Sequence, residues 1–143
     1  MLIERLKSKD FKQIRELIDE YKKSINEDKL NDVQYESLLK AIENNEIEFY
    51  VVKQKGKLIA ICSISVIFST FSCKYTGVFE DFYIDHGYRK LGIARKLTEY
   101  VFEQCKERDI TSVWVGCADV DINMYKALGF EIELGNLLTW CSD

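Results

Sequence analysis

Residues 88–96 read Tyr88-Arg89-Lys90-Leu91-Gly92-Ile93-Ala94-Arg95-Lys96 and join a predicted strand to a predicted helix. The N-terminus of a helix carries unpaired backbone N–H groups and a partial positive charge, so it attracts phosphate. Gly92 and Ala94 place small side chains at alternate positions, which lets a ligand approach the backbone. The basic side chains around them suit a polyanion such as a pyrophosphate. A basic helix start in which Gly92 serves only packing would have the same sequence.

Two other kinds of phosphate loop do not fit this stretch. A dinucleotide-binding turn needs G-x-G-x-x-G directly after the first strand, with an acidic residue about twenty positions later. A Walker loop needs G-x-x-x-x-G-K-[ST]. The sequence contains neither pattern.

The segments on either side of residues 88–96 predict a parallel strand–helix–strand unit. A β-rich segment covers about residues 75–85, and a buried-looking strand covers residues 111–117. Between them, Ala94, Leu97, Val101 and Cys105 recur at helical spacing. Parallel strands need such a crossover connection.

The rest of the chain predicts helices and hairpins around this unit. Asp10 with Gln13, and Asn31 with Gln34, have the spacing of capping boxes that open two helices. Gly129 ends a short helix. The predicted strands outside the parallel unit are residues 1–6, 47–53, 58–68, 130–134 and 137–141. We therefore expect a single α/β domain over residues 1–143, with a mixed, mostly antiparallel sheet of about six to seven strands flanked by helices.

Composition excludes several classes of protein. The chain has 143 residues, of which 47% are hydrophobic, which suffices for one compact core. A formal charge of −4 argues against a nucleic-acid partner. The longest apolar stretch is interrupted by serines and is too short to span a bilayer. The five cysteines lack zinc-site spacing and predict free thiols in a cytoplasmic protein without a metal.

Two motifs resemble those of one enzyme family. Arg89-x-x-Gly92-x-Ala94, after the strand at residues 80–85, resembles the acetyl-CoA-binding motif of the GCN5-related N-acetyltransferase (GNAT) family, [Gln/Arg]-x-x-Gly-x-[Gly/Ala]. Residues 123–130 resemble that family's N-x-x-x-Y-x-x-x-G-F region, with one residue fewer between the Asn and the Tyr. The order of elements agrees over the whole chain.

The resemblance implies an acetyl-CoA site in which one strand splays from its parallel neighbour and the pantetheine arm enters between them. Strand residues would pair with the pantetheine, the N–H groups of the loop would hold the pyrophosphate, and two residues of the short helix would contact the pantetheine and the adenosine end. The cofactor-binding residues implied are Phe82, Tyr83, Ile84, Arg89, Lys90, Leu91, Gly92, Ile93, Ala94, Arg95, Asn123 and Lys126.

The resemblance also suggests two catalytic residues. Tyr125, with a phenol pKa of about 10, is the predicted general acid for the departing thiolate; otherwise it is a core aromatic. Glu80 and Asp81 are adjacent on a strand, so alternation places them on opposite faces. Residues 79–83 resemble the strand of diamine and polyamine acetyltransferases whose first carboxylate is the proposed base, which favours Glu80. Two alternatives stay open: Glu80 is only a charge at the end of a strand, or a chain of water molecules accepts the proton in place of a dedicated base.

The predicted function is therefore acetyl-CoA-dependent N-acetyl transfer by direct attack of a primary amine, carried by a small molecule or a peptide. The alternative is a non-catalytic acyl-CoA-binding sensor or docking module. We expect no nucleic-acid or membrane partner. The apolar edge of the last predicted strand, which includes Trp140, favours pairing with a second copy in a homodimer.

Overall fold

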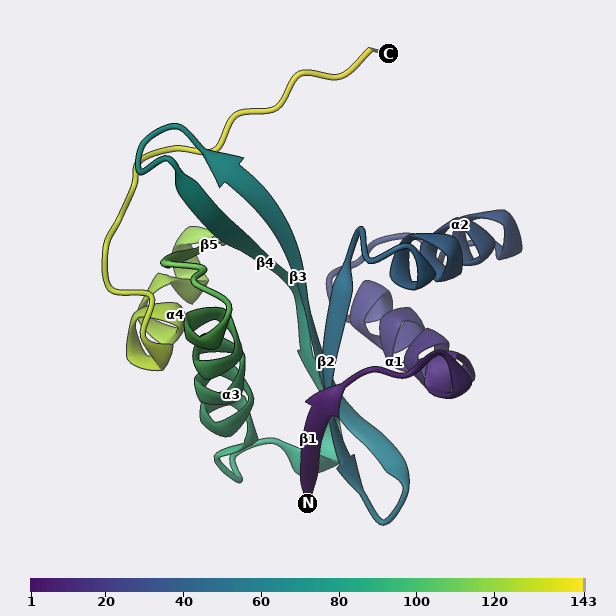
Figure 1. The fold of residues 1–143 in the computed structure, drawn as a ribbon. Coiled ribbons are helices and arrows are strands. Elements are labelled where there is room, and N and C mark those ends of the chain that lie inside the picture. The colour runs from purple at the N-terminus through teal and green to yellow at the C-terminus, as the bar shows by residue number, and fades with distance from the viewer. Residues whose placement is uncertain (143) are drawn as a thin grey trace.

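A computed structural model describes residues 1–142 of the chain. Its centre is a five-stranded sheet in the order β1-β2-β3-β4-β5 (Figure 1). Neighbouring strands run antiparallel except for β4 and β5, which are parallel. The strands are β1 (Leu2–Arg5), β2 (Glu48–Gln54), β3 (Lys57–Ser69), β4 (Lys74–Ile84) and β5 (Ser112–Val115).

Helices cover both faces of this sheet (Figure 1). One face carries α1 (Phe11–Ser24) and α2 (Asp32–Glu43), whose apolar side chains pack on residues such as Val51 and Ile61. The other face carries α3 (Ile93–Glu107) and α4 (Ile122–Leu128), with Leu97 and Val101 buried on the sheet. Short 3₁₀ turns precede α1, α3 and α4 at Ser8–Asp10, His86–Tyr88 and Asp119–Asp121. The predicted α/β class and the parallel β4-α3-β5 unit are confirmed.

Of the two predicted capping boxes, only the second forms. The Asn31 side chain accepts from the Gln34 N–H at 2.8 Å, and the Gln34 side chain accepts from the Asn31 N–H at 2.9 Å. At α1 the prediction was wrong. The Asp10 carboxylate instead accepts a hydrogen bond from Lys53 at 2.6 Å, and the Gln13 amide bonds the backbone of the β2–β3 turn. Contacts between distant segments have replaced the local cap.

The predicted C-terminal hairpin was also wrong, which is why the sheet has five strands. Residues 130–142 form no strand. Phe130 packs on the core, and the residues after it continue as an extended arm (Figure 1). Gly135, at φ 101°, redirects the chain without closing a strand ladder. None of the helices among residues 1–142 combines the length and apolar character needed to cross a bilayer.

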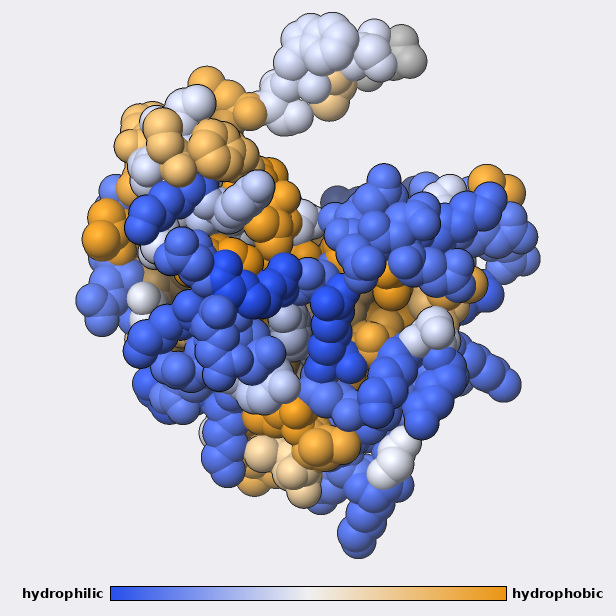
Figure 2. Space-filling view, in the orientation of Figure 1, coloured by the Kyte–Doolittle hydropathy of each residue, from blue (hydrophilic) through white to orange (hydrophobic). Residues whose placement is uncertain are grey.

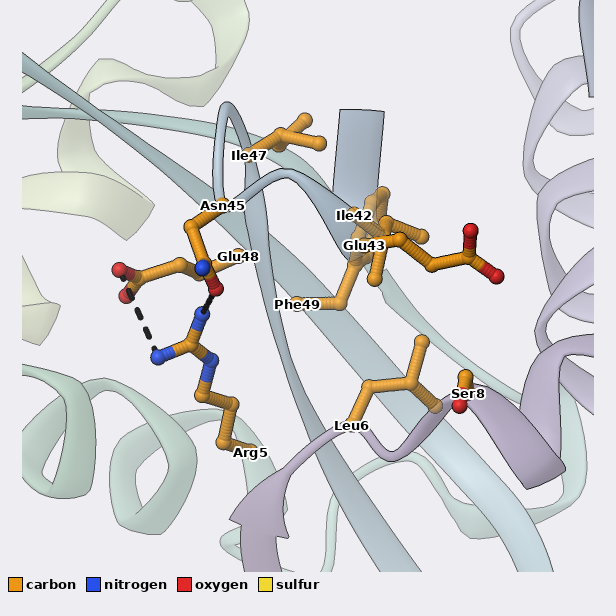
Figure 3. A pocket seen from close by; sticks show the side chains of 9 residues that line it. All are labelled: Arg5, Leu6, Ser8, Ile42, Glu43, Asn45, Ile47, Glu48 and Phe49. Carbon is orange, nitrogen blue, oxygen red and sulfur yellow. Dashed lines mark hydrogen bonds and ion pairs between the residues drawn. The ribbon is translucent and has the colours of Figure 1, made fainter. Parts of the chain in front are cut away.

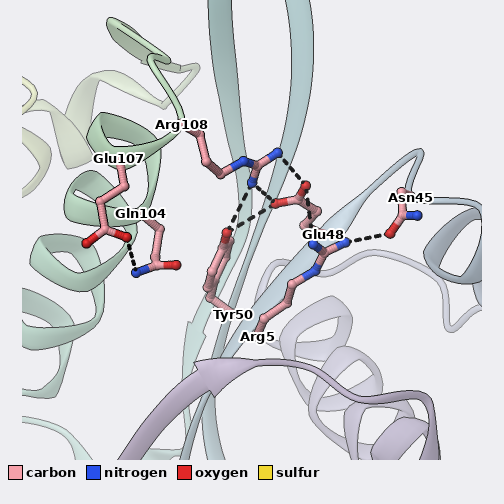
Figure 4. Close-up of polar contacts among 7 residues, drawn as sticks. All are labelled: Arg5, Asn45, Glu48, Tyr50, Gln104, Glu107 and Arg108. Carbon is pink, nitrogen blue, oxygen red and sulfur yellow. Dashed lines mark hydrogen bonds and ion pairs between the residues drawn. The ribbon is translucent and has the colours of Figure 1, made fainter.

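A buried carboxylate ties α3 to the sheet (Figure 4). Glu48 on β2 is 6% exposed, and the Arg108 guanidinium at the end of α3 donates to both of its oxygens, at 2.6 and 2.8 Å. The Tyr50 hydroxyl donates to the same carboxylate at 3.1 Å. Burial is the largest influence on the Glu48 carboxyl and opposes its ionisation. The hydrogen bonds from Arg108 and Tyr50 and the charges of Arg5 and Arg108 together outweigh burial and lower the pKa of Glu48.

We expect Arg108→Ala to lower the free energy of unfolding by about 2–3 kcal/mol, because a buried carboxylate loses both hydrogen bonds from a guanidinium and keeps only Arg5, at 3.8 Å, as a cation. Urea titration measures this loss. Since folding lowers the pKa of Glu48, the pair stabilises at neutral pH, and its contribution is lost as the pH falls through the folded-state pKa. Lys29→Ala, which removes an exposed pair with Asp19 at 3.4 Å, is the control and should cost under about 1 kcal/mol. Equal losses in the two variants would contradict this account.

Candidate active site

Strand β4 contains a β-bulge. In the register with β3, Glu80 lies opposite Ser63 and Tyr83 opposite Ile61, so Asp81 and Phe82 together face the single residue between. Asp81 has φ 53°, which is uncommon for a residue other than glycine. Its carboxylate accepts a hydrogen bond from the Ser63 hydroxyl at 2.7 Å, which holds this conformation. A bulge bends its strand and increases the local twist.

The parallel pairing of β4 with β5 stops directly before this bulge. It runs from Thr76 opposite Ser112 to Phe79 opposite Val115, and residues 80–84 have no β5 partner. We call this unpaired length of β4 the β4–β5 split. The Asp85 N–H donates to the Ile59 carbonyl on β3 at 2.8 Å. Because neighbouring N–H groups of a strand point to opposite sides, the Ile84 N–H points toward the split.

The bulge places both carboxylates of the strand on one face. Glu80 is registered with Ser63, and Asp81 is hydrogen-bonded to Ser63, so both lie on the face that carries α1. Phe79 and Phe82 pack on the opposite face. The predicted opposite orientation of Glu80 and Asp81 was therefore wrong, because simple alternation fails where a strand carries an extra residue.

Electrostatics link these carboxylates to Tyr21 on α1. Burial, and then the charges of Asp81 and Glu80, raise the pKa of Tyr21. Partial desolvation of its carboxyl and the nearby charge of Asp81 raise the pKa of Glu80, although the residue as a whole is exposed. The helical spacing of Tyr21 indicates only that its side chain faces inward. Nothing in the sequence indicates that its hydroxyl lies near a functional site.

Tyr125 approaches the split from the other face of the sheet. It lies on α4, with its ring 6.2 Å from the ring of Phe82 and 5.8 Å from that of Phe130. Burial, followed by the proximity of Tyr21, raises the pKa of Tyr125 to about 12. The hydroxyls of two tyrosines from opposite faces therefore influence each other through the region where β4 and β5 separate.

The N-terminus of α3 presents a row of free backbone donors. Among residues 1–142, no acceptor receives a hydrogen bond from the N–H groups of residues 90–95. Gly92, the N-cap, has φ 79° and open space around the position of a Cβ atom. Ile93 is buried beneath the helix and anchors it. This backbone conformation, left-handed at Lys90 as well, turns several N–H groups outward to an anion-binding position.

The other predicted cofactor residues have mixed surroundings. The Arg89 Nε donates to the Ile84 carbonyl at 3.0 Å, and its guanidinium lies 5.4 Å from the Tyr83 ring centroid. The Tyr83 ring faces α1, and its backbone is paired with Ile61 on β3. Three more of these side chains lie at the surface. Arg95 donates to the Ala127 carbonyl at 2.9 Å, and Lys126 pairs with Glu133 at 2.8 Å. The Asn123 side chain is exposed. Lys90 and Leu91 are exposed as well.

Two further features bear on other kinds of site. Within residues 1–142, no three His, Cys, Asp or Glu side chains lie close enough to hold a metal ion, and the cysteines there are unpaired thiols. A hollow of about 330 Å³ opens between the end of β1 and the start of β2, lined by Arg5 and Glu48 on one side and Phe49 on the other (Figure 3). It lies at the sheet edge opposite β5 and contains none of the predicted site residues.

A family model described as the acetyltransferase (GNAT) family matches residues 11–130, which is most of the chain. The chain belongs to the GNAT family. Members of that family use acetyl-CoA. The free donors at the start of α3 and the β4–β5 split therefore belong to a protein of a family that uses this cofactor. The sequence matches no curated protein.

Solved structures share the fold over the full chain. A probable acetyltransferase has a TM-score of 0.89 at 19% identity, covering 100% of this chain and 99% of that one. An aminoglycoside acetyltransferase from an uncultured soil metagenomic sample, in complex with sisomicin, has a TM-score of 0.85 at 19% identity and covers 99% and 95%. A predicted acetyltransferase with acetyl-CoA from Clostridium acetobutylicum has a TM-score of 0.80 at 18% identity and covers 96% and 94%. At these identities the likeness establishes the fold.

Gly92→Ala tests the α3 donors, with Gly56→Ala as a matched control. The two glycines have φ of 79° and 78°, and each has open space where the Cβ would lie. We expect each variant to lose about 1–2 kcal/mol of stability, because alanine is strained in this conformation. Only Gly92→Ala should also weaken the rise in melting temperature caused by acetyl-CoA. Equal acetyl-CoA shifts in the two variants would contradict a role for this loop in binding.

Proposed function

We propose that this protein transfers the acetyl group of acetyl-CoA to a primary amine at the β4–β5 split. The observation that carries the proposal is the convergence on that split of a backbone donor row, a half-buried tyrosine and two carboxylates. The donors belong to residues 90–95, the tyrosine is Tyr125, and the carboxylates are those of Glu80 and Asp81.

The proposed cofactor position follows from the direction of the free donors. The N–H groups of residues 90–95 would hold the pyrophosphate, since a helix N-terminus favours an anion. The pantetheine would extend along β4, where the Ile84 N–H points into the split and Phe82, at the bulge, would supply a second backbone contact. This arrangement brings the thioester to the bulge, beside Tyr125. A backbone N–H there would polarise the thioester carbonyl.

The proposed reaction is a direct displacement. The neutral amine nitrogen attacks the thioester carbonyl carbon, a C–N bond forms, and the C–S bond breaks. Tyr125 would donate its hydroxyl proton, as a hydrogen bond or in full, to the departing sulfur of CoA. The proton that the ammonium must lose before attack would pass to Glu80, directly or through water. The nitrogen that has formed the C–N bond loses its second proton as the C–S bond breaks, and through water this proton replaces the one given to sulfur. The products are an N-acetylated amine and the free thiol of CoA.

The charge of the site supports a cationic acceptor. Glu80 and Asp81 lie on the same face of β4, and two adjacent carboxylates attract an ammonium group. The α1 face, which carries Tyr21, would then contact the acceptor. The proposed acceptor is a primary amine of a small molecule or a peptide. The aminoglycoside bound to one structure of the same fold is an example of the small-molecule class.

Tyr125→Phe should lower kcat by about 100-fold or more, because it removes the proposed proton donor to the thiolate. Acetyl-CoA should still raise the melting temperature of this variant. Tyr100→Phe is the matched control, since Tyr100 is half-buried on α3 and packs 6.1 Å from Tyr50, away from the split. Unchanged turnover in Tyr125→Phe would exclude Tyr125 as the acid.

Glu80→Gln should lower kcat/KM and remove the low-pH limb of the rate profile. A base must be ionised to accept a proton, so the wild-type rate should fall as the pH drops through the raised pKa of Glu80. Asp81→Asn keeps an oxygen that can accept from Ser63 and so preserves the bulge. If Asp81→Asn loses the limb and Glu80→Gln keeps it, Asp81 is the base; if both keep it, water performs the deprotonation.

The direct test of the proposal is an acetyl-transfer screen over small diamines, aminoglycosides and peptide amines, measured by release of the free thiol of CoA. We expect turnover with at least one cationic amine. No stabilisation by acetyl-CoA would overturn the proposed site as a whole. Stabilisation without turnover on any amine would favour a binding module over an enzyme.

A further inference from the structure

We propose that Tyr21 receives the attacking amine: its hydroxyl oxygen accepts a hydrogen bond from an N–H of the acceptor, beside the carboxylates of Glu80 and Asp81. Tyr21 lies on α1, so this helix supplies one wall of the acceptor site. The inference rests on the proposed function, because it concerns the amine that reacts at the β4–β5 split. Neither of the two sequence motifs includes Tyr21.

The Tyr21 side chain is held close to the bulge of β4. Its ring centroid lies 6.0 Å from that of the Tyr83 ring, and both side chains pack on the apolar cluster beneath α1. Tyr83 is the first residue after the bulge that pairs with β3 again. Burial and then the charges of Asp81 and Glu80 raise the pKa of Tyr21, so its hydroxyl lies within electrostatic range of both carboxylates.

The Tyr21 hydroxyl has no hydrogen-bond partner among residues 1–142. The hydroxyls of Tyr35 and Tyr50, by contrast, each bond to a carboxylate. Every buried polar side-chain atom in the described part of the chain has a partner, so the unpaired hydroxyl of Tyr21 is accessible to solvent. A half-buried ring thus fixes the position of a free polar group.

The neighbouring carboxylates lack a cation. Glu48 is neutralised by Arg108, but neither Glu80 nor Asp81 forms an ion pair within residues 1–142. The Asp81 carboxylate is held by the Ser63 hydroxyl, which brings no charge. A protonated amine suits this arrangement, because its charge satisfies the carboxylates and its N–H groups can donate to the phenol oxygen.

The chemistry of the phenol limits Tyr21 to holding the amine. Burial and two neighbouring carboxylates disfavour the phenolate, so Tyr21 stays protonated and does not take the proton of the ammonium. It instead fixes the nitrogen on the α1 face of the split, while Tyr125 reaches the departing sulfur from the α4 face. Figure 2 shows the surface indented between the helices of the two faces, and the acceptor would enter there.

Tyr21→Phe removes the hydroxyl and keeps the ring. With the amine that the acetyl-transfer screen finds to react fastest, we expect KM for the amine to rise about 10-fold or more, as for a lost hydrogen bond to a charged group. The melting temperature, and its rise with acetyl-CoA, should stay at the wild-type values, because the hydroxyl has no partner to lose. Tyr100→Phe, half-buried on α3, is the control and should change none of these. An unchanged KM in Tyr21→Phe would overturn the role of Tyr21 and leave the proposed function standing.

Two ammonium probes separate the hydrogen bond from packing. Protonated N,N-dimethylbutylamine has one N–H, whereas butyltrimethylammonium has the same charge and none. NMR titration measures the binding of each to protein saturated with acetyl-CoA. Tyr21→Phe should weaken binding of the first about 10-fold and of the second by less than about 2-fold.

The outcomes of this titration distinguish the inference from the proposed function. Equal weakening of both probes would show a structural role for the hydroxyl and overturn the inference, as would a wild type that binds neither probe. If Tyr21→Phe weakens only the N–H probe, and the wild type acetylates no amine, Tyr21 still holds an ammonium group and acetyl transfer is the claim that fails.

Discussion

The site depends on the hydrogen bond between the Asp81 carboxylate and the Ser63 hydroxyl, because it holds β4 in its bulged conformation. A left-handed backbone at a residue other than glycine costs about 1–2 kcal/mol and persists only where neighbouring contacts impose it. Ser63 is buried on β3, so its hydroxyl needs an acceptor, and the bulge supplies one. The bend that results separates β4 from β5 one residue after their last pair. The strain and the split thus have one cause.

Helix α3 connects this split to the rest of the molecule. The first turn of α3 carries the free N–H groups, and the Arg95 side chain links it to α4. At the C-terminal end of the helix, Arg108 binds Glu48 on β2. The buried side chains of Leu97 and Val101 fix the helix on the sheet between these points. Anion binding by backbone donors requires that their direction be set before the ligand arrives, since the cost of orienting them would otherwise reduce affinity. Anchoring at both ends provides this orientation.

The sequence was informative where local chemistry decides structure. The change to helical spacing after Gly92 predicted where α3 begins, and the spacing of Leu97, Val101 and Cys105 predicted its buried face. It failed where distant segments compete. Asp10 pairs with Lys53 in place of its own helix, a choice that depends on where β2 lies. The bulge at Asp81 depends on Ser63, eighteen residues earlier, so strict alternation misplaced one carboxylate.

The C-terminal arm is the clearest case of correct local periodicity with a wrong tertiary assignment. Residues 130–134 alternate as a strand should, yet a strand requires a neighbour to accept its hydrogen bonds, and a pattern within one chain does not identify that neighbour. For the predicted site residues, too, local spacing does not decide the role of a side chain. Tyr125 fits a core aromatic as well as an acid by spacing alone, and the nearness of Tyr21 emerges only when both faces of the sheet are known.

The pKa of Tyr125 limits what this residue can do in the proposed reaction. At about 12, it lies about 3.5 pKa units above an ordinary thiol, so complete proton transfer to a free thiolate would be unfavourable by about 5 kcal/mol. A hydrogen bond to sulfur, by contrast, strengthens as negative charge develops during C–S cleavage. Tyr125 therefore serves the proposed reaction best as a neutral donor to the developing thiolate. Loss of the ammonium proton, near Glu80 and Asp81, then becomes the step by which pH controls the rate.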